Sequence, residues 1–230
     1  LTLGLVGRQS RLTFVVVLQT LAANLGSMAT PVGNPQNLYL YNAFSVEAGA
    51  FFALILPLVL VSFLALSAAC LLGPDETICV SFPQPAAFRR KGRLGLMAAL
   101  FLLCLLCVFH LLHEWVLFLL VLGCLLLFGR DLLPRVDYGL LATFVCFFVF
   151  AGNIGAAPAL REALTRALAW NPALIAGLAS QVISNVPAAL LLSGFTEDWR
   201  GLLLGTDIGG LGTPVASLAS LISLKLYLRT

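Results

Sequence analysis

The sequence predicts an all-α polytopic membrane protein with two broken membrane helices and one re-entrant hairpin. Three observations support this fold class. Hydrophobic residues make up 60% of the 230-residue chain and charged residues 10%, whereas soluble domains carry about 25% charged residues. Several stretches long enough to span a bilayer as helices contain no charged residue. The same glycine- and proline-containing pattern interrupts two of the apolar segments, at residues 24–32 and 207–215.

The apolar segments follow one another along the chain, and we interpret them as parts of a single transmembrane domain covering residues 1–230. Those without an acidic or basic residue cover 12–46, 48–74, 94–113, 115–129, 138–160 and 167–196. A last apolar segment, at about 200–226, contains the second copy of the pattern. We interpret residues 12–73 as the end of a first repeat and residues 94–230 as the second repeat.

Segment 167–196 is expected to form a re-entrant hairpin over about 172–195, with its turn at Ser184-Asn185-Val186-Pro187. As a single span, it would place this polar, proline-containing break in the middle of the membrane. Lys and Arg accumulate on the cytoplasmic side. Of the thirteen Lys and Arg residues, the hairpin topology places ten on the cytoplasmic side and a single span places nine. Charge therefore favours the hairpin only weakly. The hairpin also gives the two copies of the pattern opposite orientations, as an inverted repeat requires.

The repeated pattern marks a candidate binding site. Its equivalent positions, 183 residues apart, are Asn24, Gly26 and 30–32 in the first copy and Asp207, Gly209 and 213–215 in the second. Glycine and proline leave helix backbone groups unpaired, which hydrocarbon tolerates only where protein or water replaces the lost bonds. Carbonyls freed at such breaks suit Na⁺, and amide ends suit an anion. The alternative interpretation is a pair of kinked helices with small-residue packing.

Asp207 is the acidic residue that we place well within a membrane segment, whereas its counterpart Asn24 is neutral. An intramembrane carboxylate is a functional candidate. Asp207 could help to hold Na⁺, carry a proton or cap the helix break, and the sequence leaves these interpretations open.

Other function classes find little support in the sequence. No nucleophile–base pair or Walker motif appears, so we expect no enzyme and no cofactor besides Na⁺ or H⁺ as coupling ion. Cys104 and Cys107 are interpreted as packing residues of an apolar helix. His110, His113 and Glu114 are interpreted as an interfacial turn, so no metal other than Na⁺ is expected. No basic cluster with interleaved aromatic residues indicates a nucleic-acid partner.

The residues at the breaks and the hairpin turn resemble the ion transporter superfamily. This group includes citrate-transporter-like and divalent anion:sodium symporters, arsenite permeases and a class of sodium/proton antiporters. Residues 26–37 resemble its first broken helix, 180–188 its second hairpin tip and 207–217 its second broken helix. The resemblance covers nearly the whole chain. The family has a further hairpin before its first broken helix, so the chain is expected to be the C-terminal portion of a transporter or a remnant of one.

The resemblance implies an inverted-repeat transporter with each Na⁺ between a hairpin tip and a broken helix, and with the anion between the two tips. Carried over, the substrate-binding residues are Thr30, Pro31, Asn34, Ser184, Asn185, Val186, Thr213 and Pro214. The Na⁺-binding residues are Gly26, Ser27, Gly33, Ser180, Ser184, Asn185, Gly209 and Gly212. Val186 stands where the family often has threonine.

We therefore expect a secondary active transporter in a prokaryotic plasma membrane. It would move a small anion, such as citrate, a dicarboxylate or an inorganic anion, coupled to Na⁺ or H⁺. Arsenite efflux and Na⁺/H⁺ exchange are the alternatives within the same fold. The expected partners are the anion, the lipid bilayer and, from the resemblance alone, a second copy in a homodimer.

Overall fold

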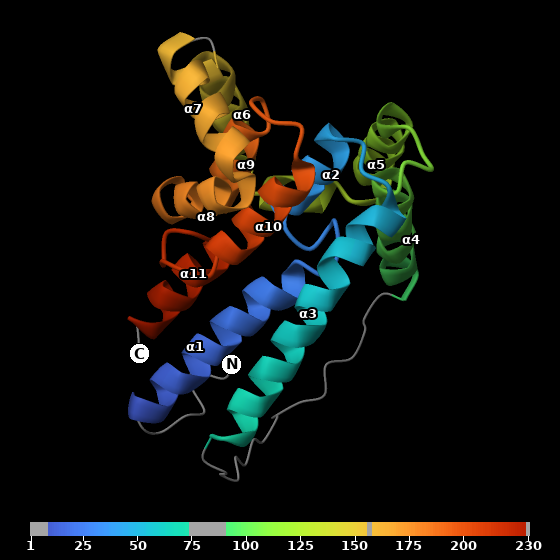
Figure 1. Cartoon of the computed structure of the whole chain (residues 1–230). Coiled ribbons are helices and arrows are strands. Elements are labelled where there is room, and N and C mark those ends of the chain that lie inside the picture. Colours follow the sequence, from blue (N-terminus) through green and yellow to red (C-terminus); the bar gives the residue numbers. More distant parts are fainter. Residues whose placement is uncertain (1–8, 74–90, 156–157, 229–230) are drawn as a thin grey trace. The chain divides into compact units, whose positions relative to one another are not determined.

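The computed structural model describes residues 9–73, 91–155 and 158–228, whose regular elements are all helices (Figure 1). In chain order they are α1 (Gln9–Ser27), α2 (Pro35–Ala43), α3 (Ala48–Leu71), α4 (Lys91–Val108), α5 (Glu114–Phe128), the 3-10 helix η2 (Arg130–Arg135), α6 (Tyr138–Gly155), α7 (Pro158–Trp170), α8 (Pro172–Ile183), α9 (Asn185–Leu192), α10 (Trp199–Gly209) and α11 (Leu218–Tyr227). The predicted all-α class is confirmed for this part of the chain.

Among the described helices, α3 is long and apolar enough to cross a membrane by itself. Its Leu60, Val61 and Phe63 side chains are exposed, as expected of a helix in contact with lipid. α6 and α7 provide a second crossing if they are treated as one bent span, and the remaining apolar helices are shorter. Length and composition therefore identify fewer full crossings in the described part than the sequence predicted.

The chain divides into two compact units, one formed by residues 1–79 with 146–230 and the other by residues 80–145. The second unit contains α4, α5 and η2. There, Arg93 Nη2 donates to both carboxylate oxygens of Asp131, at 2.7 and 2.8 Å. These hydrogen bonds hold the pKa of the Asp131 carboxyl below its usual range. The first unit contains both copies of the repeated pattern and every predicted site residue.

Both copies of the repeated pattern interrupt a helix. α1 ends at Ser27 and α2 begins at Pro35, while α10 ends at Gly209 and α11 begins at Leu218. Pro35 takes the first position of α2, where its missing N–H leaves no hydrogen bond unmade. The starts of α2 and α11 are 183 positions apart, which is the offset of the repeated pattern. The second half of each broken helix therefore begins at the equivalent residue.

The segment predicted as a hairpin forms two helices, α8 and α9, which are separated by Ser184 alone. Ser184 has φ 73° and ψ 155°, a conformation that residues with a β-carbon rarely adopt. The predicted turn over 184–187 is therefore too long. Asn185, Val186 and Pro187 form the first turn of α9, where a proline needs no backbone donor.

The predicted extent of the apolar segment 138–160 is wrong, because two helices, α6 and α7, share it. α6 ends at Gly155, and the last residues of this segment belong to α7, which begins at Pro158. α7 is amphipathic and carries an exposed ion pair, in which Arg166 Nη2 donates to Glu162 Oε1 at 2.6 Å. Proline readily starts a helix, and an uninterrupted run of apolar residues did not reveal the boundary.

The core of the first unit lies where α2, α8, α9 and α10 contact one another. Leu40 of α2, Leu192 of α9 and Leu202 of α10 are almost completely buried there. Small residues such as Ala176 of α8 and Ala188 of α9 are also fully buried. This core fixes the turn between α8 and α9 against the break between α10 and α11.

Candidate functional site

Glycines bring the backbones of α8 and α10 close together. Three of them recur every fourth residue on α10 and are buried: Gly201, Gly205 and Gly209. A β-carbon at Gly209 would lie 2.9 Å from Gly177 Cα and 2.9 Å from Ser180 Cβ of α8. Such contacts are typical of small-residue packing between membrane helices. The structure thus brings together Ser180 and Gly209, two of the residues predicted to bind Na⁺.

The turn at Ser184 and Asn185 is hydrogen-bonded to the break between α10 and α11. The Asn185 backbone N–H donates to the Ala216 carbonyl at 2.9 Å, and Ser184 Oγ donates to the same carbonyl at 3.3 Å. Thr213 Oγ1 donates in return to the Gln181 carbonyl at 3.2 Å. The predicted association of this turn with the second break is therefore seen in the geometry.

Gln181 belongs to this contact, although the sequence pattern did not reveal it. Its Nε2 donates to the Gly209 carbonyl, which lies at the last residue of α10, and to the Gly177 carbonyl at 3.3 Å. A β-carbon at Gly212 would collide with the Gln181 side chain. The available signal was a polar residue next to Ser180 within an otherwise apolar segment.

The predicted residues of the first break make hydrogen bonds and close contacts within that break. Ser27 Oγ donates to the Asn24 carbonyl at 3.0 Å, and a β-carbon at Gly33 would collide with the Ser27 backbone. Pro31 is buried, whereas Thr30 is exposed. Among the described residues, no hydrogen bond joins residues 26–34 to Ser184 or Asn185. The two predicted halves of the substrate site are therefore not joined by a direct hydrogen bond in this part of the chain.

The two broken helices contact each other in a reciprocal way. Thr13 Oγ1 and Tyr227 Oη are 2.9 Å apart, and Asn24 Nδ2 donates to Ser220 Oγ at 3.3 Å. The start of α1 thus lies at the end of α11, and the two helices are antiparallel neighbours (Figure 1). The other two halves, α2 and α10, also contact each other.

The contact between α2 and α10 is centred on Asp207, which is 4% exposed. Gln36 Nε2 donates to Asp207 Oδ1 at 3.0 Å, and the side chains of Asn34 and Asn37 also lie beside this carboxyl group. Asp207 is therefore held by α2 rather than by the end of its own helix. Asn34, predicted to bind substrate, belongs to this cluster. Gln36 was not predicted as a site residue.

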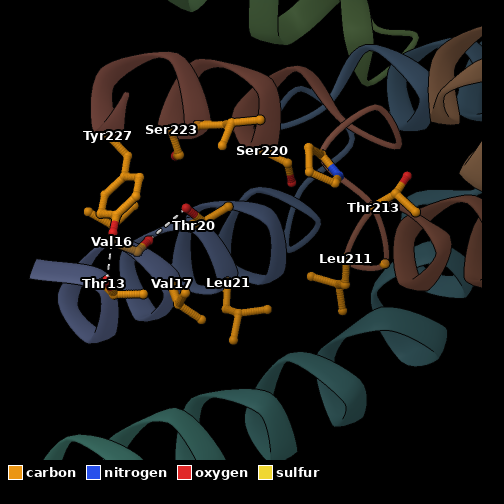
Figure 2. Close-up of a pocket in the computed structure, with 13 residues that line it drawn as sticks. Thr13, Val16, Val17, Thr20, Leu21, Leu211, Thr213, Ser220, Ser223 and Tyr227 are labelled. Atoms are coloured by element: carbon orange, nitrogen blue, oxygen red, sulfur yellow. Dashed lines mark hydrogen bonds between the residues drawn. The ribbon is translucent and has the colours of Figure 1, made fainter. Parts of the chain in front are cut away.

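A cavity of about 320 Å³ lies between α1, α11 and the second break (Figure 2). Its lining combines aliphatic side chains with hydroxyl groups, which belong to Thr13, Thr20, Thr213, Ser220, Ser223 and Tyr227. No acidic or basic residue is among its described lining residues. Of the predicted substrate-binding residues, Thr213 and Pro214 line this cavity, whereas Thr30, Pro31, Asn34 and the Ser184–Val186 turn do not.

Comparison with known proteins gives one family match and two curated relatives. The sequence profile of the citrate transporter family matches residues 1–196. The uncharacterized transporter MJ0456 of Methanocaldococcus jannaschii is 31% identical over 212 residues, which are 92% of this chain and 58% of that protein. The inner membrane protein YbiR of Escherichia coli is 30% identical over 222 residues, with coverage of 92% and 58%. The chain thus spans somewhat over half the length of these relatives. No solved structure matches it.

Proposed function

The chain belongs to the citrate transporter family, and from this premise we propose that it acts in the secondary active transport of a small carboxylate anion coupled to Na⁺ or H⁺. The family is one of integral membrane transporters, not of enzymes. Citrate or a dicarboxylate is the substrate class that we propose. The inner-membrane location in the name of YbiR supports placing the protein in a prokaryotic plasma membrane.

The observation that carries the proposal is the contact of the α8–α9 turn with the second helix break. The contact joins two places where helices end inside an apolar part of the chain, and so gathers carbonyl and amide groups that are not paired within a continuous helix. Discontinuous helices of this kind form the ion and substrate sites of secondary transporters. Ser184 Oγ, Asn185 Oδ1 and the carbonyls near Gly209 offer the oxygen ligands that Na⁺ requires.

A coupled cation also meets the electrostatic needs of the anion. The described residues of α2, α8, α9, α10 and α11, which surround the break, include two basic side chains, Arg200 in the first turn of α10 and Lys225 in the last turn of α11. Both lie at the helix end that is farther from the break. A carboxylate anion in this region needs a cation or helix amide ends to offset its charge, because an unpaired charge in a medium of low polarity is costly. Binding of the cation would therefore favour binding of the anion.

The reciprocal contacts of the broken helices support an inverted repeat. Asn24 and Asp207 are equivalent in the repeated pattern, and so are Asn37 and Ser220, which lie 183 positions apart. Asn24 donates to Ser220, and Asp207 lies beside Asn37. The same pair of positions thus meets twice, with the roles of the two repeats exchanged. An approximate two-fold axis between antiparallel repeats has this consequence.

Ligand-dependent thermal stability of the purified full-length protein tests the proposal. We expect citrate or a dicarboxylate to raise the melting temperature in Na⁺ buffer or at low pH, and to do so much less in K⁺ buffer at neutral pH. At a hundred times the dissociation constant, one bound ligand adds about 2.7 kcal/mol. Stabilisation by arsenite alone would favour the arsenite-permease alternative. The absence of any anion effect under all these conditions would contradict the proposal.

A further inference from the structure

Three buried oxygen atoms of the α2–α10 contact have no hydrogen-bond partner among the residues that the structure describes. They are Asp207 Oδ2, Gln36 Oε1 and Asn37 Oδ1. Gln36 and Asn37 are 1% and 0% exposed, and both side chains lie beside the Asp207 carboxyl. Leaving a buried acceptor unpaired is unfavourable for a neutral group, and more so for a charged one. Three such atoms on residues in mutual contact require a physical explanation.

The orientation of the two amides follows from their donor groups. Gln36 Nε2 donates to Asp207 Oδ1 at 3.0 Å, so exchanging its oxygen and nitrogen would place two acceptors against each other. Asn37 Nδ2 donates to the Met28 carbonyl at 3.3 Å, and exchange would again oppose two oxygens. The network therefore uses the amide nitrogens and leaves the oxygens unpaired. These three unpaired atoms are all acceptors, which is the arrangement that a positive ligand needs.

The charge balance favours a monovalent cation. Among the described residues of α2, α8 and α9, which pack against α10, there is no Lys, Arg or His to pair with Asp207. α1 also contacts α10, and its basic residue, Arg11, lies near the start of α1. One monovalent cation would make the site neutral, whereas a divalent ion would leave a buried positive charge. Ca²⁺ sites usually draw on six to eight oxygens with several carboxylates, and the described part of the chain has no group of three acidic, His or Cys residues.

A bound proton explains the site less completely than a cation does. A proton on Oδ2 would turn that atom into a donor to one amide oxygen, and the other amide oxygen would still be unpaired. A small cation accepts lone pairs from all three oxygens at once. Carboxylate and carbonyl oxygens are the ligands that hard cations prefer.

We propose that Asp207, Gln36 and Asn37 form a Na⁺ site between the second half of one broken helix and the first half of the other. The site is separate from the contact of the α8–α9 turn with the second break, because it uses none of the same side chains. Occupation of this site would tie α2 to α10 and thereby link the two repeats. Its role in coupling rests on the proposed transport function, whereas its ability to bind Na⁺ does not.

Asp207→Asn tests the proposal through an unusual combination of effects on stability. The amide introduced at position 207 can donate to one of the unpaired oxygens, and the change removes a buried charge. We therefore expect the variant to have a higher melting temperature than the wild type in Na⁺-free buffer, and to gain less stability than the wild type when NaCl replaces choline chloride. Glu47→Gln is the matched control, because it makes the same chemical change at an exposed position and should behave as the wild type.

Na⁺-induced infrared difference spectra give an independent readout. In the wild type and in Glu47→Gln, Na⁺ should shift a carboxylate stretching band that Asp207→Asn lacks. Asn37→Ala removes one neutral ligand, so it should retain the band and need at least about tenfold more Na⁺ to shift it, which corresponds to 1.4 kcal/mol or more. This variant keeps the test informative if Asp207→Asn does not fold.

Three outcomes would overturn the Na⁺ site. They are an unchanged Na⁺ response in Asp207→Asn, a carboxylate band that responds to pH but not to Na⁺, and an unaltered Na⁺ requirement in Asn37→Ala. None of these measurements includes a transported anion. A protein that shows the Asp207 band shift but binds no anion would therefore support the site while contradicting the transport function.

Discussion

Leucine in place of Gly209 is expected to lower the free energy of unfolding by about 3 kcal/mol, because overfilling a tightly packed interface displaces backbone as well as side chains. A β-carbon at this position would lie 2.9 Å from Gly177 Cα, and contacts with backbone atoms cannot be relieved by a change of rotamer. α10 would have to move away from α8. This movement would also break the hydrogen bond from Gln181 to the Gly209 carbonyl, so the turn at Ser184 would lose its support.

The melting temperature of the purified protein in detergent measures this effect. Gly123→Leu is the control, because a β-carbon at Gly123 in α5 has no described neighbour within 4 Å. We expect Gly209→Leu to melt far below the wild type and Gly123→Leu to melt near it. Equal melting of Gly209→Leu and the wild type would show that α8 and α10 do not pack as described.

Replacement of Ser184 is expected to separate stability from transport. Ser184 has φ 73°, and a residue with a β-carbon in this conformation carries roughly 1–3 kcal/mol of strain. Ser184→Gly also loses the hydrogen bond from Ser184 Oγ to the Ala216 carbonyl, but it should relieve the strain, so we expect its melting temperature to rise. Ser184→Ala should keep the strain and lose the hydrogen bond from Ser184 Oγ to the Ala216 carbonyl, so its melting temperature should fall. Both variants lack the hydroxyl that we propose as an ion ligand.

Transport by the two Ser184 variants distinguishes a functional serine from a structural one. Loss of a ligand hydroxyl should raise the cation concentration needed for half-maximal uptake by about tenfold, or about 1.4 kcal/mol, in both variants. A structural role alone would affect only the less stable Ser184→Ala. If Ser184→Gly transports with wild-type cation dependence, the turn is not part of the ion site.

The positions of the helix breaks could be predicted from sequence because their cause is local. Proline removes a backbone donor and glycine is a poor helix former wherever they occur. Residues 24–32 and 207–215 therefore marked both breaks, and the structure has helix ends at Ser27 and Gly209. The start of α7 at Pro158 also depends on a proline. It was not predicted, because Pro158 lies within a continuous run of apolar residues.

The details of the site depended on contacts between distant residues, which no local pattern records. Gln36 donates to Asp207, which is 171 positions away in the sequence. Nothing in the local sequence distinguishes Gln36 from the other polar residues near Pro35. The single-residue turn at Ser184 depends on the bond of the Asn185 N–H to the Ala216 carbonyl. The repeated pattern indicated that Asn24 and Asp207 were equivalent, but it did not indicate that each would lie against the opposite repeat.

Gradient-driven uptake by the full-length protein in proteoliposomes tests the central claim most directly. The measurement follows radiolabelled citrate or a dicarboxylate with an inward Na⁺ gradient, an inward H⁺ gradient or neither. Cation-coupled transport predicts that the anion accumulates above its external concentration with at least one gradient, and that collapse of this gradient releases it. Uptake that is equal with and without the gradients, or no uptake of any carboxylate tested, would contradict the account.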